Sequence, residues 1–286
     1  MRRVLLACTA DPASLNIRDR LLELADWEEV SVFDGYPVML LGDSLLFTKT
    51  GLHLDFDLVD REIAQHIEVE MSGERTGGGY PLRLLVFLSK HRSEMKVDSL
   101  TVHSPGNFGE AQYGGRPGLL PPSAPREIGQ ALRALYKTKK EAGSKDRTTF
   151  ETTHHGPYLT SPSFFIEIGS DEPRWVDRSL GEIVARSILS WDGGGDSDER
   201  RPVCIGIGGG HYAPRFSDMA IRGSADFGHM VPDHAMTSAQ DAMGMIALAM
   251  KATPGAEYVH LHRTEKNASL FKAIEHAAID LGLRMI

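Results

Sequence analysis

The sequence predicts an α/β protein in which helices cover both faces of a mainly parallel or mixed sheet. Continuous apolar runs such as Leu84–Ser89 are typical of strands that are buried on both faces. After residue 82 these runs alternate with amphipathic helical segments, as in sheets whose helices connect parallel strands. The composition changes nowhere along the 286 residues. We therefore predict a single domain over residues 1–286, with an irregular N-terminal third.

The N-terminal third is expected to hold a strand, a helix and three short strands. The apolar run Val4–Cys8 predicts the first strand. Asp11-Pro12 then supplies a capping residue and a first-turn proline, so a helix is expected to about Ala25. A turn at Gly42-Asp43 joins the last two short strands as a hairpin. The three short strands are expected over Val30–Phe33, Val38–Leu41 and Leu45–Thr48.

The rest of the chain alternates between strand and helix and is interrupted by two loops. Glycine and proline exclude regular structure from Gly106 to Pro125, and three consecutive glycines predict an exposed loop over Asp192–Arg200. Apolar residues at helical spacing predict helices over Arg126–Ala142, Pro173–Trp191, Ser238–Lys251 and Glu265–Leu281. Strands are expected over Leu84–Ser89, Leu100–His103, Phe164–Ile168, Val203–Ile207 and Tyr258–Leu261.

Charge is distributed unevenly. The formal net charge of −8 argues against a surface that is basic everywhere, but residues 126–147 hold seven basic and three acidic side chains, a net charge of +4. Such a patch suits one phosphate-bearing partner, and a solvated helix face is the alternative. From this patch we assign nucleic-acid contacts to Lys137, Lys139 and Lys140.

The cellular location follows from the cysteines and from the apolar runs. Cys8 and Cys204 both lie in strand-like apolar runs, so we expect buried free thiols in a reducing compartment. No apolar run approaches the ~20 residues that a membrane helix needs, and no signal peptide is indicated. We therefore expect a cytoplasmic protein that has no membrane partner.

The stretch from Ile205 to Arg215 carries the most chemistry. A buried strand stops in three glycines, which are followed directly by His211 and Tyr212. Backbone N–H groups of a glycine turn can hold a phosphate or an oxyanion. An arginine beside it can pair with a phosphate or a carboxylate, with a simple surface position as the alternative. His211 is a candidate catalytic residue. Candidate substrate-binding residues are Gly208, Gly209, Gly210 and Arg215.

Histidines follow several of the predicted strands, where open α/β sheets bind their ligands. Zinc binds histidine nitrogen, but the spacing here matches no known zinc motif. Adjacent His154 and His155 would point to opposite faces of a regular strand, although Gly156-Pro157 favours a turn there. We favour one as a ligand or base and the other as its hydrogen-bonded neighbour. We take His155 as catalytic. The candidate metal ligands are His103, His154 and His229, the last in an expected loop over Phe227–His234.

Glu167 is a carboxylate inside the apolar run Phe164–Ile168. A buried carboxylate must be paired with a cation, bound to a metal or shifted to a higher pKa. Glu167 is therefore a candidate catalytic base. The alternatives are a metal ligand, a partner of a ligand and an exposed position on an edge strand. The remaining histidines lie in polar or amphipathic surroundings and are expected at the surface or as hydrogen-bonded core residues. These are His53, His66, His91 and His276.

Five islands of sequence together resemble the archaeal-type D-aminoacyl-tRNA deacylases, a family also found in plants. The islands are Asp11–Ser14 with Asn16-Ile17, His103–Asn107, Thr153–Pro157, Glu167–Ser170 and Gly208–Arg215. The resemblance implies hydrolysis of the ester between a D-amino acid and tRNA, a zinc cofactor, and a fold of the phosphorylase/peptidyl-tRNA hydrolase kind. It supplies no set of zinc ligands, so the assignments above stay inferences from the residues.

Both lines lead to one hypothesis: hydrolysis of D-aminoacyl-tRNA to free D-amino acid and tRNA by zinc-activated water. Glu167 or a free histidine would move the proton, and the glycine turn would stabilise the oxyanion. The expected partner is D-aminoacyl-tRNA and not DNA, and the expected state is a monomer, with a dimer as the alternative. The competing hypotheses are a zinc aminopeptidase or amidohydrolase on a related α/β fold and a non-catalytic tRNA-binding protein.

Overall fold

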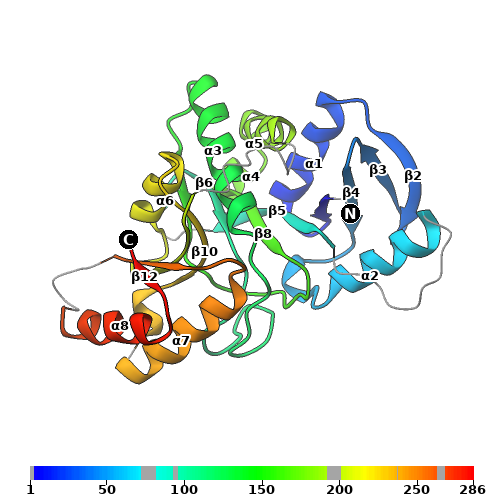
Figure 1. The fold of residues 1–286 in the computed structure, drawn as a ribbon. Helices are drawn as coiled ribbons and strands as arrows, with labels where there is room; N and C mark the ends of the chain where they lie inside the picture. Colours follow the sequence, from blue (N-terminus) through cyan, green and yellow to red (C-terminus); the bar gives the residue numbers. More distant parts are fainter. Residues whose placement is uncertain (1–2, 72–81, 93–95, 192–200, 237, 263–267) are drawn as a thin grey trace.

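The computed structural model describes residues 3–71, 82–92, 96–191, 201–236, 238–262 and 268–286, and within them the strands form two sheets. The large sheet is mixed: β1 lies parallel to β4 and β5, while β6 is antiparallel to β8. In spatial order its strands are β2 (Glu28–Phe33), β3 (Tyr36–Leu41), β4 (Ser44–Lys49), β1 (Arg3–Cys8), β5 (Leu84–Arg92), β8 (Ser163–Ser170), β6 (Ser99–His103) and β7 (Arg147–Phe150) (Figure 1).

The small sheet is parallel throughout, and it follows the large sheet in the chain. Its order is β10 (Asp226–Val231), β9 (Val203–Ile207), β11 (Tyr258–Leu261) and β12 (Arg284–Met285). A run of six buried residues forms β10, although a loop was expected over Phe227–His234. The expectation failed because His229 interrupts the apolar pattern, whereas in the structure its ring is fully buried and hydrogen-bonded.

Helices cover both faces of the large sheet, as predicted. Leu5 and Ala7 of β1 belong to the core that contains α1, α3 and α5, whereas the alternate residues Leu6 and Cys8 face a second core with α2. The bounds are α1 (Pro12–Leu24), α2 (Val59–His66), α3 (Pro125–Glu141) and α5 (Arg178–Ser190). The α/β prediction is therefore confirmed, while the single-domain organisation stays a prediction.

Helices also enclose the small sheet (Figure 1). On one side α3 and α6 (Pro214–Ile221) join its strands to the first core, and on the other α7 (Ala239–Ala252) and α8 (Ala268–Asp280) form a third core. The predicted loop over Asp192–Arg200 lies outside the described residues. The single helix predicted over Pro173–Trp191 is divided into α4 (Glu172–Trp175) and α5. Elements that the sequence did not predict are α2, α6, β7, β12, 3₁₀ turns at His53–Asp55 and Asp233–Ala235, and a π-helical turn at Ile67–Met71. No helix in the described ranges is long and apolar enough to cross a membrane.

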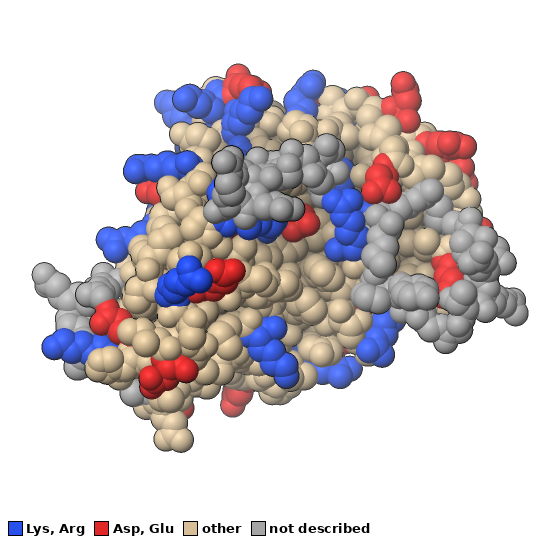
Figure 2. Space-filling model, viewed as in Figure 1, with Lys and Arg blue, Asp and Glu red and all other residues tan. Residues whose placement is uncertain are grey.

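The basic stretch around α3 divides into two kinds of residue. Figure 2 shows Lys and Arg side chains along the edge of the molecule where α3 and α6 lie. Lys137 and Lys140 are exposed there. Arg126 and Arg133, in contrast, donate hydrogen bonds to the fully buried carboxylate of Asp226. These two arginines serve the packing of α3, so their charges are not available to a partner.

Gly129 of α3 lies against the same carboxylate. A Cβ at Gly129 would come 2.2 Å from Asp226 Oδ1. The Asp226 carboxylate cannot move away, because three arginines hold it in place. We expect Gly129→Ala to lower the free energy of unfolding by about 1–3 kcal/mol, because the overpacking outweighs the better helix propensity of alanine. Gly244→Ala in α7, where a Cβ meets no atom within 4 Å, should instead raise it by about 0.5–1 kcal/mol. Urea denaturation of both variants measures the contrast, and equal effects would contradict it.

Candidate active site

A stripe of polar side chains crosses the face of the large sheet that carries α2. Alternate residues of a strand share a face, so His91 of β5 lies on the side of Phe87, and Glu167 of β8 lies on the side of Phe165. His103 of β6 pairs in register with Phe165 and stacks on its ring at 5.1 Å. We expected the site beyond the carboxyl ends of the strands, but it lies on the face of the sheet. The reason is that β6 is antiparallel to β8 and β5, so its carboxyl end and that of β5 lie at opposite ends of the sheet.

Five histidines meet over this stripe. The ring centroids of His103 and His154 are 4.3 Å apart, and those of His154 and His155 are 4.4 Å apart. His211, which follows β9, lies 4.7 Å from His154 and 5.0 Å from His91. The structure thus brings together residues that are more than 100 positions apart in the chain.

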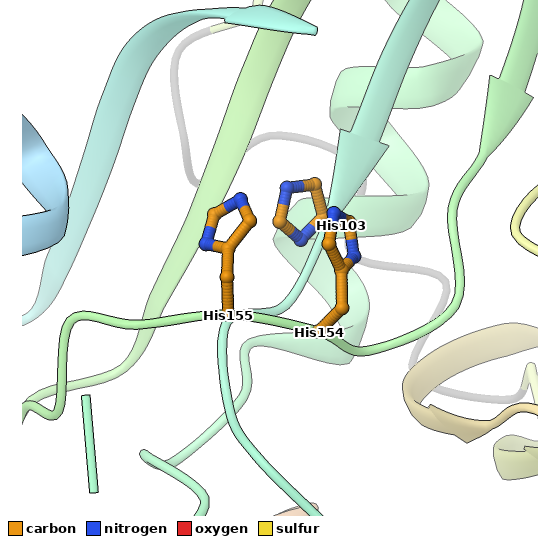
Figure 3. Close-up of side chains that lie close together, drawn as sticks. All are labelled: His103, His154 and His155. Atoms are coloured by element: carbon orange, nitrogen blue, oxygen red, sulfur yellow. The ribbon is translucent and has the colours of Figure 1, made fainter. Parts of the chain in front are cut away.

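Three of these imidazoles point toward one another, and we call them the three-histidine cluster: His103, His154 and His155 (Figure 3). One nitrogen of each lies within 4.8 Å of the others. Each Nδ1 lies 2.6–3.2 Å from a backbone carbonyl oxygen, which can only accept, so each Nδ1 carries the proton. The carbonyls belong to Ser104, Thr152 and Gly156. In the neutral form of each ring Nε2 then offers a lone pair, the arrangement typical of metal-binding histidines. Burial lowers the pKa of His103, but Glu167 beside its Nε2 outweighs burial and raises it.

The backbone at His155 explains how two adjacent residues can share one site. His155 has a φ of 44°, in the left-handed region, so the chain turns there and does not continue as a strand. Gly156 follows in a close approach, where a Cβ would lie 2.1 Å from Gly115 N. The turn that Gly156-Pro157 favoured is therefore present, and it lets both rings face one site, which a regular strand would not allow. Burial, with the neighbouring imidazoles adding to it, holds the pKa of both rings well below the usual range, which keeps them neutral.

Glu151 lies at the centre of the site, and the sequence analysis missed it. Its side chain is fully buried, with Oε2 at 2.8 Å from His211 Nε2 and 3.4 Å from His154 Nε2, and Oε1 at 3.2 Å from His91 Nδ1. Neither oxygen receives a well-aligned hydrogen bond from the described residues. Burial raises its pKa, but His211 and His91 outweigh this and hold the pKa well below the usual range, so Glu151 is ionised. A charged residue three positions before His154, in a run that is otherwise uncharged, was the available signal.

Glu167 lies in the site, as its buried position in the sequence suggested. Because β8 runs between β5 and β6, the alternative of an exposed edge position is excluded. Its carboxylate lies 3.7 Å from His103 Nε2 and 3.9 Å from His91 Nδ1, and it accepts a hydrogen bond from Thr101 Oγ1 at 3.5 Å. His103 Nε2 itself is buried and makes no hydrogen bond with the described residues.

Two further residues complete the rim of the site. His91, expected at the surface or in the core, stacks on His211 and contacts Tyr212 Oη with Nε2 at 3.0 Å. Burial lowers the pKa of His91, but Glu151 and Glu167 outweigh burial and raise it. Tyr212 lies in the Gly208–Arg215 island, whereas His91 belongs to none of the five islands, and only the fold brings the two to Glu151.

A buried group of Cys8, Asp11 and His53 adjoins the site, where the His53 ring lies 6.0 Å from that of His155. Asp11 is fully engaged: Oδ1 accepts from Ala13 N and Ser14 N as the helix cap, while Oδ2 accepts from Lys90 N and Ser89 Oγ. Burial raises the pKa of Cys8 to about 12 and lowers that of His53 to about 3. The thiol is therefore protonated, and both cysteines are buried and free, as predicted.

The structure does not bring His229 to the other histidines. Its Nε2 donates to Pro121 O at 2.9 Å, and Nδ1 then accepts from Thr153 Oγ1 at 3.1 Å. Burial lowers the pKa of His229 to about 4, so the ring is neutral. Both ring nitrogens are engaged in hydrogen bonds that hold the loop ahead of α3, and no lone pair is left for a metal. The metal assignment of His229 is corrected on this ground.

The glycine turn and Arg215 lie beside the site. Gly208 N already donates to Val231 O, so this N–H group is not available to an oxyanion. Gly208 and Gly209 have positive φ values of 98° and 92°, whereas Gly210 does not. Arg215 lies exposed at the start of α6, four residues after His211.

Comparison with known proteins decides the family. A family model described as D-aminoacyl-tRNA deacylase matches residues 79–286. The chain belongs to the D-aminoacyl-tRNA deacylase family. The resemblance drawn from the five sequence islands is confirmed, and with it the enzyme class, a family of hydrolases that act on the ester bond of aminoacyl-tRNA.

Relatives of the same description align over most of the chain. The D-aminoacyl-tRNA deacylase of Pyrococcus horikoshii is 35% identical over 244 residues, 84% of each chain. That of Methanosarcina mazei is 34% identical over 99% of this chain and 92% of its own. A crystal structure described as a conserved protein of unknown function superposes with a TM-score of 0.79 at 28% identity, covering 99% of this chain and 94% of that one.

Proposed function

We propose that this chain hydrolyses the ester bond of D-aminoacyl-tRNA, releasing D-amino acid and tRNA, at a zinc site formed by the three-histidine cluster. One observation carries the zinc assignment: three imidazoles converge beside a buried, ionised carboxylate, each with its Nδ1 on a backbone carbonyl, and two of them, His154 and His155, are held neutral. Family membership supports the substrate. The aminopeptidase and the non-catalytic alternatives have no comparable support.

The donor set fits zinc, which prefers imidazole nitrogen and carboxylate oxygen. His103, His154 and His155 would hold the ion, with Glu151 or Glu167 as the carboxylate that balances its charge. When bound, zinc lowers the pKa of water and polarises a carbonyl. Backbone carbonyls fix the three rings before any ion arrives, which lowers the cost of ordering the ligands.

His211 and Glu151 would move the protons. The His211 side chain is 44% exposed at the mouth of the site, while Glu151 Oε2 holds its Nε2 from the buried side. In this arrangement the carboxylate orients the ring for proton transfer. The ring can take a proton from the attacking water and return it to the 3′ oxygen of the leaving ribose. The exposed lysines of α3 would contact the tRNA backbone, away from the reacting atoms.

The function is tested with one amino acid attached to tRNA in its D and L forms. The wild-type chain should release the D-amino acid much faster than the L-amino acid, since only one enantiomer can present its ester without a clash of its side chain. His154→Ala should lower kcat/KM on the D-substrate by about 10²-fold or more, because it removes a ligand. Equal rates on both enantiomers would contradict the chiral part of the proposal.

Removal of the metal gives a separate prediction. The purified chain should contain stoichiometric zinc, and a chelator should abolish hydrolysis until zinc is returned. His103→Ala should lower the zinc content measured by elemental analysis. The matched control is His276→Ala, which changes an exposed histidine of α8 and should leave the zinc content unchanged. Full activity in the metal-free protein would remove zinc from the proposal.

A further inference from the structure

A cavity of about 460 Å³ lies between α6 and the end of β11, outside the histidine site. It is lined by Pro214, Arg215, Asp218, Met219, Arg222, Ser224 and His262. Both arginines are exposed, and Asp218 is the single acidic residue of the lining, so the cavity is positive at neutral pH. Its lining differs from the histidine site, because it contains two arginines.

The two arginines are uncommitted. Within the described ranges neither the Arg215 nor the Arg222 side chain forms an ion pair or a hydrogen bond, although Asp218 lies three positions after the one and four before the other. Arg126, Arg133 and Arg201 of the neighbouring elements, in contrast, all contact Asp226. Guanidinium groups that no protein carboxylate neutralises are well suited to bind an external anion.

His262 forms one wall of the same cavity. Its Nδ1 is buried and has no hydrogen-bond partner among the described residues, while its backbone N donates to Ile207 O at 2.7 Å. A Cβ at Gly208 would lie 2.7 Å from His262 O, so the positive-φ glycine turn is what allows this residue to pack so closely. This close packing is a sufficient reason for glycine at the turn, and a role in oxyanion binding is not needed to explain it. It also places the His262 imidazole beside the two arginines.

The cavity is also close to the reacting groups. Arg215 follows His211 by four residues, a length of chain that spans at most about 14 Å. His211 contacts Glu151 at the mouth of the histidine site. One short segment therefore lines both places, and a substrate whose ester reaches His211 carries its nearest phosphates past the cavity.

We infer that this cavity binds a backbone phosphate of the single-stranded 3′ end of tRNA, next to the ester. The inference rests on the proposed function and adds to it a binding subsite. Arg215 and Arg222 would donate hydrogen bonds to the phosphate oxygens, and His262 would form the opposite wall of the subsite. The subsite would hold the end of the tRNA in register with His211, independently of the lysines on α3.

The test measures the binding of an RNA hairpin that carries an acceptor stem and an unpaired CCA end but no amino acid. Fluorescence anisotropy reports the binding over a range of salt concentrations. In the double variant Arg215→Gln/Arg222→Gln the Kd at low salt should rise about tenfold. The plot of the logarithm of the association constant against the logarithm of the salt concentration has a negative slope. Its magnitude should decrease by about 0.7, the value for one lost phosphate contact on a single strand. Arg215→Lys/Arg222→Lys should keep most of the slope, because the charges remain.

Two controls localise the effect. Arg186→Gln, which removes an exposed arginine of α5 that pairs with Glu182, should bind the hairpin as the wild type does. A hairpin without the unpaired CCA should bind wild type and double variant equally. If the double variant binds the full hairpin with an unchanged slope, the phosphate subsite is wrong.

Hydrolysis of D-aminoacyl-tRNA by the wild type is measured separately, so the two proposals can fail separately. Hydrolysis together with an unchanged slope in the double variant would overturn the subsite and leave the enzyme function in place. The expected loss of slope in the double variant, together with a wild-type protein that hydrolyses no D-aminoacyl-tRNA, would overturn the function and support the subsite.

Discussion

Glu151→Gln is expected to lower kcat/KM for D-aminoacyl-tRNA by about 10³-fold, the scale of a lost proton-transfer group in an enzyme site. Glutamine keeps the size of the side chain and removes its charge. His211 would lose the carboxylate that lies 2.8 Å from its Nε2, and the three-histidine cluster would lose the anion that balances a bound cation. Two separate effects therefore act in the same direction.

Three measurements distinguish these effects. Zinc content reports on the metal, kcat/KM at saturating zinc reports on proton transfer, and urea denaturation reports on folding. Glu182→Gln, an exposed position on α5, is the matched control and should change none of them. A Glu151→Gln protein that is folded and retains wild-type kcat/KM would remove Glu151 from the reaction.

The sequence could predict strands and most helices because their apolar patterns are local. Val203–Ile207 and Tyr258–Leu261 were predicted at the bounds that the structure has. The pattern failed at β10, where the His229 ring is buried through hydrogen bonds and not through apolarity. It also failed for α6, whose first turn lies in a stretch that resembled a binding loop.

The site could be predicted only in part, for a topological reason. His103, His154 and Glu167 stood out because each is a polar residue at the end of, or within, an apolar run. His91 and Glu151 are 60 positions apart, and only the order β5-β8-β6-β7 brings them within 3.2 Å. Such a contact depends on strand order, which no local pattern specifies.

Asp226→Ala is expected to lower the free energy of unfolding by about 3 kcal/mol. The carboxylate is fully buried and accepts from Arg126, Arg133 and Arg201 at 2.9–3.2 Å, joining α3 to β10 and to the start of β9. Removing one partner of a buried ion pair costs about 3–5 kcal/mol, since the remaining charge stays uncompensated. The lower end applies because the arginine side chains are 11–30% exposed, so water reaches them in the variant.

Asp226→Asn provides the test of cause, because it keeps an acceptor oxygen and removes the charge. Asp226→Asn should lose less unfolding free energy than Asp226→Ala if both the charge and the hydrogen bonds of the ion pairs contribute to stability. The two variants should lose the same amount if the charge alone matters. Asp19→Ala, at an exposed residue that contacts Arg18 on the surface of α1, should cost less than about 1 kcal/mol. An Asp226→Ala protein as stable as the Asp19→Ala control would show that apolar packing between α3 and β10 holds this junction without the three arginines. Arg126 and Arg133 would then have to be counted again among the charges available to tRNA.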